Sequence, residues 1–148
     1  MFVRAYRDDD WAEWLRMSHA LFPAESEASL MSGMRDFRGR RDVAVFVVDR
    51  GDGRLAGFVE AGTRAYADGC DTSPVGYIEA WFIDPDVRRQ GWGRALLSAA
   101  EDWARAQGYT EMASDALLDN ELSHTAHRGV GYEEVGRIVQ FRKVLEPH

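Results

Sequence analysis

The chain has 148 residues, 45% apolar and 29% charged, a composition typical of one soluble globular domain. Its net charge of −7 argues against nucleic acid as a partner, whose phosphates Lys and Arg would have to neutralise. The charge either suits a cationic partner or simply keeps the protein soluble. No apolar run approaches the ~20 residues of a membrane span, and the first residues lack the apolar stretch of a signal peptide, so we expect no membrane partner and a cytoplasmic location.

The residue pattern predicts ten elements in the order β-α-α-β-β-β-α-β-α-β, which indicates an α/β fold around a mixed sheet. The expected strands cover residues 2–6, 43–48, 55–61, 77–83, 111–115 and 132–145, the last as one long strand or a hairpin. The expected helices cover residues 11–22, 25–37, 95–107 and 120–130. We find no repeat and no linker, so we expect a single domain over residues 1–148.

A segment rich in glycine and arginine joins the 77–83 strand to the 95–107 helix. Residues 87–94 read VRRQGWGR. Glycine lets the backbone approach a ligand closely, and a helix N-terminus offers unpaired N–H groups with a partial positive charge. We therefore expect a phosphate or pyrophosphate here. The segment matches neither the dinucleotide fingerprint, which needs a third glycine, nor a Walker loop, which needs Gly-Lys-Ser/Thr.

At this segment the sequence resembles the GNAT superfamily of N-acetyltransferases. Its signature, Arg/Gln-x-x-Gly-x-Gly/Ala between a strand and a helix, is matched by Arg88, Gly91 and Gly93. Further stretches are similar to the aminoglycoside 6′-N-acetyltransferases: residues 66–74, Glu79, residues 111–115, residues 120–132 and residues 141–143.

The resemblance implies the GNAT acyltransferase fold, a mixed central sheet flanked by about four helices. It also implies acetyl-coenzyme A as cosubstrate, no metal, a cationic aminoglycoside acetylated directly on its 6′-amine, antibiotic resistance and a homodimer. The cofactor residues that it implies are Trp81, Phe82, Ile83, Arg88, Arg89, Gln90, Gly91, Trp92, Gly93, Arg94 and Asn120.

Glu79 and Asp115 are the candidate catalytic residues. A protonated amine cannot attack a thioester because its lone pair is occupied, so the site must accept a proton. A lone carboxylate within an apolar strand, as at Glu79, is costly to bury unless it is paired or used. The resemblance implies that Glu79 assists deprotonation and that Asp115 holds a substrate ammonium group. Two alternatives stay open: Glu79 faces outward while Ile78 and Ala80 face the core, and Asp115 caps a turn.

A polycationic sugar needs carboxylates for its ammonium groups and flat faces for its rings. By resemblance the substrate-binding residues are Phe22, Tyr66, Asp71, Glu79 and Asp115, with Asp68 as further lining. Phe22 stands where similar enzymes have tryptophan, and Gly136 stands where some have an acidic ligand.

Three further residues have two readings each. Asn120 either contacts the pantetheine arm, by resemblance, or caps a helix. His127 stands where many GNAT enzymes have a tyrosine that protonates the leaving thiolate, but a packing histidine fits equally, so the general acid stays unassigned. Cys70, the single cysteine, is read as a packing residue rather than a nucleophile, and it forms no metal-ligand spacing with the four histidines.

Two other functions remain compatible with these patterns. The same chemistry could act on a polyamine, a small metabolite or a protein N-terminus. The chain could also be a coenzyme A binding module without activity, although an intact Glu79 counts against it.

Overall fold

The computed structural model describes residues 1–147, in which five strands and four α-helices occur. The elements are β1 (Phe2–Ala5), α1 (Trp11–Leu21), α2 (Glu27–Arg38), β2 (Ala44–Asp49), β3 (Leu55–Arg64), β4 (Val75–Ile83), α3 (Trp92–Ala106), β5 (Met112–Ser114) and α4 (Glu121–Gly129). Short 3-10 turns at Asp8–Asp10 and Pro85–Val87 precede α1 and α3. The chain divides into two compact units, one up to Asp115 and one from Ala116 onward.

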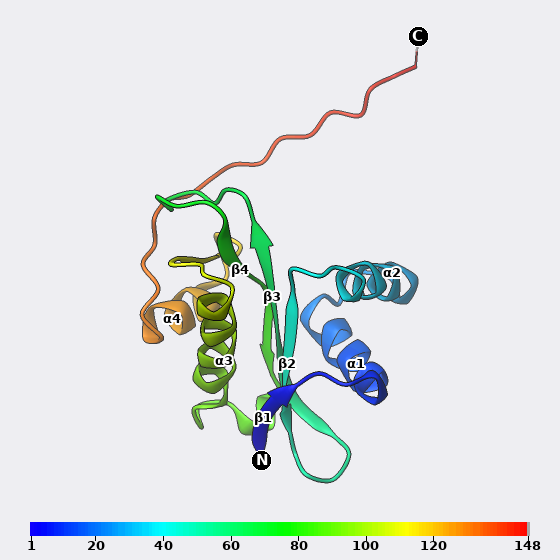
Figure 1. Ribbon diagram of the computed structural model, residues 1–148. Helices are drawn as coiled ribbons and strands as arrows, with labels where there is room; N and C mark the ends of the chain where they lie inside the picture. Colours follow the sequence, from blue (N-terminus) through cyan, green and yellow to red (C-terminus); the bar gives the residue numbers. More distant parts are fainter. Residues whose placement is uncertain (148) are drawn as a thin grey trace. The chain divides into compact units, whose positions relative to one another are not determined.

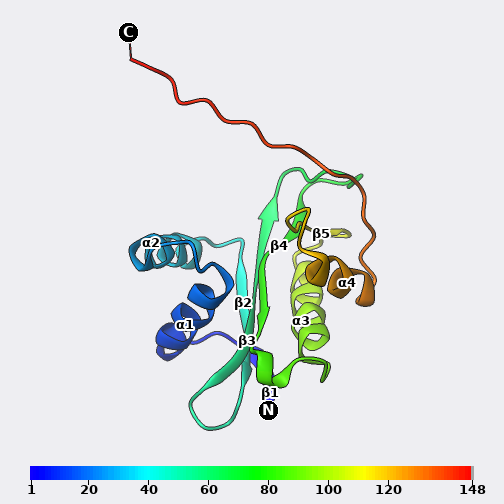
Figure 2. The ribbon, with the colours of Figure 1, turned by 180° about the vertical axis from the view of Figure 1, so that it is seen from behind.

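The first unit holds a mixed sheet in the order β1-β2-β3-β4-β5. The first three pairings are antiparallel, and β4 pairs with β5 in parallel. Helix α3 covers one face of this sheet, and α1 and α2 cover the other (Figure 1). The view from behind shows the same three layers (Figure 2). The predicted mixed-sheet α/β fold is thus confirmed.

Each face of the sheet has an apolar layer of its own. On the α1 and α2 face, Trp14 and Met17 are fully buried against Phe58 and Phe82. On the other face Leu96, Leu97 and Ala100 of α3 are buried. Burying a large apolar side chain is worth ~1.5–3 kcal/mol, so these layers hold the sheet between its helices.

A β-bulge interrupts the pairing of β3 with β4. Glu60 lies opposite Ala80, whereas the next residue, Ala61, lies opposite Ile78, so Glu79 has no partner across the ladder. A bulge of this kind inserts one extra residue and re-aims the side chains around it. Ala80 consequently packs in the cluster with Trp14.

The bulge also decides which way Glu79 points. A Cβ on Gly62 would lie 3.6 Å from Cγ of Glu79 and 3.8 Å from the ring of Phe37 in α2, so Glu79 shares the α1 and α2 face. A Cβ on Gly76 would instead lie 3.1 Å from Ala104 of α3, and by strand alternation Ile78 faces α3 too. Ile78 and Ala80 are both buried, as that alternative expected, but on opposite faces of the sheet. Its other part, an exposed Glu79 that faces outward, is wrong, because Glu79 lines the cavity on the α1 and α2 face.

Three expectations about the secondary structure need correction. Strand β3 runs on to Arg64, and α3 begins at Trp92 rather than at residue 95. The strand or hairpin expected at 132–145 is wrong, because residues 132–147 form neither helix nor strand. A β-strand needs a hydrogen-bonded neighbour, and within residues 1–147 this segment has none. No helix in the described residues is long and apolar enough to cross a membrane.

Candidate active site

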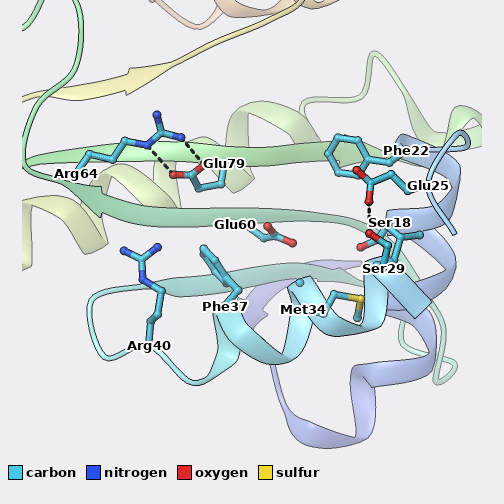
Figure 3. A pocket seen from close by; sticks show the side chains of 12 residues that line it. Ser18, Phe22, Glu25, Ser29, Met34, Phe37, Arg40, Glu60, Arg64 and Glu79 are labelled. Carbon is cyan, nitrogen blue, oxygen red and sulfur yellow. Dashed lines mark hydrogen bonds and ion pairs between the residues drawn. The ribbon is translucent and has the colours of Figure 1, made fainter. Parts of the chain in front are cut away.

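A cavity of about 480 Å³ opens on the α1 and α2 face of the sheet, within the first unit (Figure 3). Its size falls in the range of small-molecule sites, ~300–1,000 Å³. Its wall is formed by Ser18, Phe22, Glu25, Ser29, Leu30, Gly33, Met34, Phe37, Arg40, Glu60, Arg64 and Glu79. Three carboxylates and two guanidinium groups therefore meet in one cavity beside apolar side chains.

Glu79 lies in the cavity wall and is held there by Arg64 of the neighbouring strand. The Arg64 guanidinium donates from Nε to Oε1 at 3.0 Å and from Nη2 to Oε2 at 2.8 Å (Figure 3). This bidentate pairing fixes the plane of the carboxylate as well as its position. The same guanidinium lies 3.5 Å from the ring centre of Tyr77. Both oxygens of Glu79 therefore already have a donor.

Asp115 follows β5 and is joined to this group through Tyr77. The Tyr77 hydroxyl donates to Oδ2 of Asp115, and the parallel register puts Ile78 beside Ser114. Burial, together with the hydrogen bond to Asp115, raises the pKa of Tyr77 above its ordinary value. Glu79, Arg64, Tyr77 and Asp115 thus form a continuous chain across three strands. No pattern in the sequence singles out Arg64 or Tyr77.

Glu60 is a third carboxylate of the site that the sequence analysis missed. It lines the cavity from β3, and its Oε1 accepts a hydrogen bond from Nε1 of Trp14 at 3.1 Å. Burial raises the pKa of Glu60 to about 7, and the nearby charge of Glu79 adds to that rise. The signal that pointed to Glu79, a lone carboxylate within an apolar strand, is equally present at Glu60 in its run of residues 55–62.

The other predicted substrate residues are distributed unevenly. Phe22, just after α1, lines the cavity and is 41% exposed. Tyr66 and Asp71 lie in the loop between β3 and β4, and within residues 1–147 neither belongs to the cavity wall. The Tyr66 hydroxyl donates to Asp68 at 2.9 Å, and the carboxylate of Glu111 anchors the loop by accepting from the backbone N–H of Asp71 at 2.9 Å. Their role in substrate binding stays a prediction.

The glycine- and arginine-rich segment forms the start of α3. Gly91 is the residue before the helix and has a φ of 90°, a left-handed conformation that favours glycine. No side chain caps this end of the helix, and its first turn contains no acidic residue. The N–H groups of that turn are thus directed at a place where an anion is favoured.

Gly93 brings the same helix close to strand β4. A Cβ there would lie 3.1 Å from Cζ2 of Trp81, and the Trp81 indole donates to the Gly93 carbonyl oxygen at 3.2 Å. Phe82 faces the core on the opposite side of the sheet, so only its backbone can meet a ligand at this place. Arg88 donates from Nε to the carbonyl oxygen of Ile83 at 2.9 Å, which ties the loop to the end of β4. The remaining segment residues are half-buried or exposed: Arg89, Gln90, Trp92 and Arg94.

The second unit contains the remaining candidates. Asn120 precedes α4, and its Oδ1 accepts from the backbone N–H of Ser123 at 3.1 Å, so the capping role is realised. His127 donates from Nδ1 to the Ser123 carbonyl oxygen at 2.7 Å, and its ring lies 5.9 Å from that of Tyr132. At Gly136 a Cβ would meet no atom within 4 Å.

The sequence analysis also made predictions about Cys70 and about metal binding. Cys70 is a free, half-buried thiol packed beside Ala67, Val75 and Tyr77, which agrees with a packing role. Across residues 1–147 no group of three or more His, Cys, Asp or Glu side chains is arranged to hold a metal ion.

Comparison with known proteins gives consistent matches over nearly the whole chain. Residues 7–132 match the sequence model described as the acetyltransferase (GNAT) family. An aminoglycoside N(6′)-acetyltransferase type 1 of Klebsiella aerogenes is 40% identical over 146 residues, which are 97% of this chain and 96% of that protein.

Two solved structures are similar at the level of the fold and of the sequence. Aminoglycoside antibiotic 6′-N-acetyltransferase AAC(6′)-IG of Acinetobacter haemolyticus superposes with a TM-score of 0.91 at 33% identity, covering 99% of this chain and all of that one. AAC(6′)-Iy in complex with the bisubstrate analogue CoA-S-monomethyl-acetylneamine gives a TM-score of 0.89 at 29% identity, covering 97% and 98%.

Proposed function

The chain belongs to the acetyltransferase (GNAT) family, and we propose that it transfers an acetyl group from acetyl-coenzyme A to the 6′-amine of an aminoglycoside antibiotic. The observation that supports this acceptor is the cavity, where the bulge of β4 turns the carboxylate of Glu79 toward a space that Glu60 and Glu25 also line. A polycation with sugar rings suits a wall of carboxylates interrupted by Phe22 and Phe37. The names of the relatives point to the same substrate class.

The N-terminus of α3 suits the pyrophosphate of coenzyme A, which supplies the activated acetyl group. The uncapped N–H groups after Gly91 would hold the phosphate oxygens, and Arg88, Arg89 and Arg94 add positive charge around them. Backbone groups of Trp81, Phe82 and Ile83 would line the pantetheine arm along β4. Gly93 keeps this helix end in contact with Trp81 and so places the phosphates relative to the strand.

Glu79 and Asp115 are the proposed catalytic pair. The carboxylate of Glu79, oriented by Arg64, would attract the substrate ammonium group and assist its deprotonation by fixing its position. Asp115, oriented by Tyr77, would hold a second ammonium group. Asn120 would contact the pantetheine arm, and Tyr66 and Asp71 would complete the acceptor site from the β3–β4 loop.

The proposal also keeps four predictions about the whole protein. They are a single domain over residues 1–148, a homodimer, a cytoplasmic location, and no nucleic acid or membrane partner. The net charge of −7 supports the absence of nucleic acid, because phosphate repels such a surface.

The decisive experiment is an acetylation assay with purified protein and acetyl-coenzyme A. The panel should contain kanamycin and tobramycin, a polyamine, a small amine metabolite and a peptide with a free N-terminus. We expect acetylation of the aminoglycosides with the highest kcat/KM, and mass spectrometry with NMR should place the acetyl group on the 6′-nitrogen. Turnover of the polyamine or peptide alone would replace the proposed substrate, and no turnover with bound coenzyme A would indicate a binding module.

A further inference from the structure

The cavity contains two polar groups to which the proposed function assigns no step of the reaction. One is the carboxylate of Glu60, to which the described part of the chain gives a single hydrogen bond, from Trp14 to Oε1. The other is the hydroxyl of Ser18, which is 3% exposed and has no hydrogen-bond partner in residues 1–147. Buried polar groups are nearly always paired, so the unpaired Ser18 hydroxyl indicates that a polar ligand enters this part of the cavity, where the Glu60 carboxylate forms part of the wall.

Glu60 and Glu79 lie next to each other across the bulge. Glu60 pairs in register with Ala80, the residue after Glu79, and both side chains face the same cavity (Figure 3). Their partners differ sharply. Arg64 occupies both oxygens of Glu79, whereas Glu60 keeps Oε2 for a ligand. A cation held by Glu79 would therefore lie beside a second carboxylate that can bind a proton.

We propose that Glu60 takes the proton from the substrate ammonium group, while Glu79 and Arg64 hold that group in place. The inference rests on the proposed N-acetyltransferase function and assigns the proton step within it. An efficient general base has a pKa near the working pH. Burial raises the pKa of Glu60 to about 7, which suits a base that must release its proton again in each cycle.

The step balances in atoms and charge. A proton passes from the ammonium nitrogen to Oε2 of Glu60, which leaves the nitrogen with a lone pair. The nitrogen forms its bond to the acetyl carbon as the carbon–sulfur bond breaks and the electron pair goes to sulfur. The nitrogen then loses a second proton, which neutralises the sulfur, and Glu60 returns its proton to the solvent.

The charged groups around the cavity of Glu60 come from β3, β4 and the two ends of α2. The charge of Glu79 on β4 raises the pKa of Glu60, and Arg64 on β3 forms an ion pair with Glu79. Arg40, after α2, is paired with Asp42 at 3.0 Å, and Glu25, before α2, accepts from Ser29 at 2.9 Å. From α1 only the uncharged donor Trp14 reaches Glu60. The pKa of Glu60 is therefore set by burial, by Trp14 and by Glu79.

The test is a set of pH profiles of kcat/KM with an aminoglycoside that the wild-type protein acetylates. Wild type should lose activity as the pH falls through about 7. Glu60→Gln keeps an oxygen for Trp14 but cannot take a proton. We therefore expect kcat/KM to fall ~10²-fold, and we expect the acidic limb of the profile, which is the loss of activity at low pH, to disappear. Glu60→Asp should recover part of the activity. The limb from the substrate amine itself should stay in place in every variant.

Two other variants should move the limb instead of removing it. Trp14→Phe removes a hydrogen bond that stabilises the carboxylate, so the pKa of Glu60 should rise and the limb should move to higher pH. Glu79→Gln removes a nearby negative charge, so the pKa should fall and the limb should move to lower pH. A purely structural Glu60 would give neither shift. Glu27→Gln, the same exchange at an exposed position in α2, should leave the profile as in wild type.

A measurement without substrate separates this inference from the proposed function. The indole Nε1–H resonance of Trp14, identified by its loss in Trp14→Phe, reports on Glu60 directly. It should titrate with a midpoint near 7 in wild type and stay constant in Glu60→Gln. If the resonance titrates but no aminoglycoside is acetylated, the proposed function is wrong, while the titration of Glu60 is confirmed. A resonance that does not titrate, or an unchanged limb in Glu60→Gln, overturns the inference.

Discussion

The start of α3 and the acceptor cavity differ in how the chain builds them. The first comes from a continuous segment, residues 87–94, whose glycines and helix position already indicate a bound phosphate. The second collects its wall from α1, α2, β3 and β4, and no two of its carboxylates are neighbours in sequence. A local backbone site can thus be read from a short pattern, whereas a side-chain site depends on which strands meet and in which register.

The two regions also use different chemistry to meet opposite charges. The helix start offers N–H groups that are fixed by the backbone and need no particular side chain. The cavity offers carboxylates whose behaviour depends on their partners, since Arg64 holds Glu79 while Trp14 and burial govern Glu60. Mutations in the cavity should therefore change the kinetics of the acceptor. Mutations at the start of α3 should change the KM for acetyl-coenzyme A.

The largest effect is expected at Glu79, the cavity residue that the bulge positions. Glu79→Gln keeps one oxygen for Arg64 but removes the negative charge that attracts an ammonium group. We expect kcat/KM for the aminoglycoside to fall ~10²-fold, the scale of a reacting group that is no longer held in position. The KM for acetyl-coenzyme A should change little, and steady-state kinetics with each substrate varied in turn will show this.

Glu25→Gln provides a matched comparison within the same cavity. Glu25 is exposed and its carboxylate accepts from Ser29, so its contribution should be that of a surface charge, ~1 kcal/mol or less. Equal losses of kcat/KM in the two variants would mean that only the total charge of the cavity affects the acceptor. The position that the bulge gives Glu79 would then have no effect.

A smaller effect is expected at Gly91, on the cofactor side. Valine would have to adopt a φ of 90°, and a β-branched side chain in the left-handed region costs at least ~1–2 kcal/mol. No protein atom lies within 4 Å of the added Cβ, so its new methyl groups stand where the phosphates would approach. We expect Gly91→Val to raise the KM for acetyl-coenzyme A ~10-fold or more by such strain and loss of fit, with little change in the KM for the aminoglycoside.

Gly53→Val controls for the backbone strain alone. Gly53 has a φ of 86° in the turn between β2 and β3, and its Cβ would also meet nothing within 4 Å. This variant should lower the melting temperature in a similar way while the KM for acetyl-coenzyme A stays as in wild type. The same rise in KM in both variants would remove residues 87–94 from the cofactor site.

Much of the fold follows from patterns that are local in sequence. Apolar periodicity predicted α1, and the segment with Gly91 and Gly93 predicted that a helix follows, although α3 begins at Trp92, three residues earlier than expected. Each of these signals is contained within a few turns. The direction of Glu79 could not be derived in that way. It depends on a one-residue shift between Glu60 and Ala61, which is a property of two paired strands.

The errors at residues 132–145 and at Glu60 have the same physical origin. The β-branched and aromatic residues of this segment favour a strand, but a strand forms only where a neighbour supplies hydrogen bonds, and a single chain segment does not show its neighbour. Glu60 similarly reads as one polar residue in an apolar strand until Trp14, from 46 residues away, is seen to donate to it. Long-range pairing decides both cases.

The smallest effect is expected at Asn120, where capping and cofactor binding can be separated. Its Oδ1 caps α4, so the amide nitrogen is the part that a pantetheine carbonyl would meet. Asn120→Asp keeps the cap and removes that donor. It should leave the melting temperature unchanged and raise the KM for acetyl-coenzyme A ~5-fold, the value of one hydrogen bond of ~1 kcal/mol. Asn120→Ala should add a loss of ~1 kcal/mol in helix stability, measurable by thermal denaturation. If Asn120→Asp leaves that KM unchanged, Asn120 only caps the helix, and the cofactor side then rests on residues 87–94 and the backbone of β4.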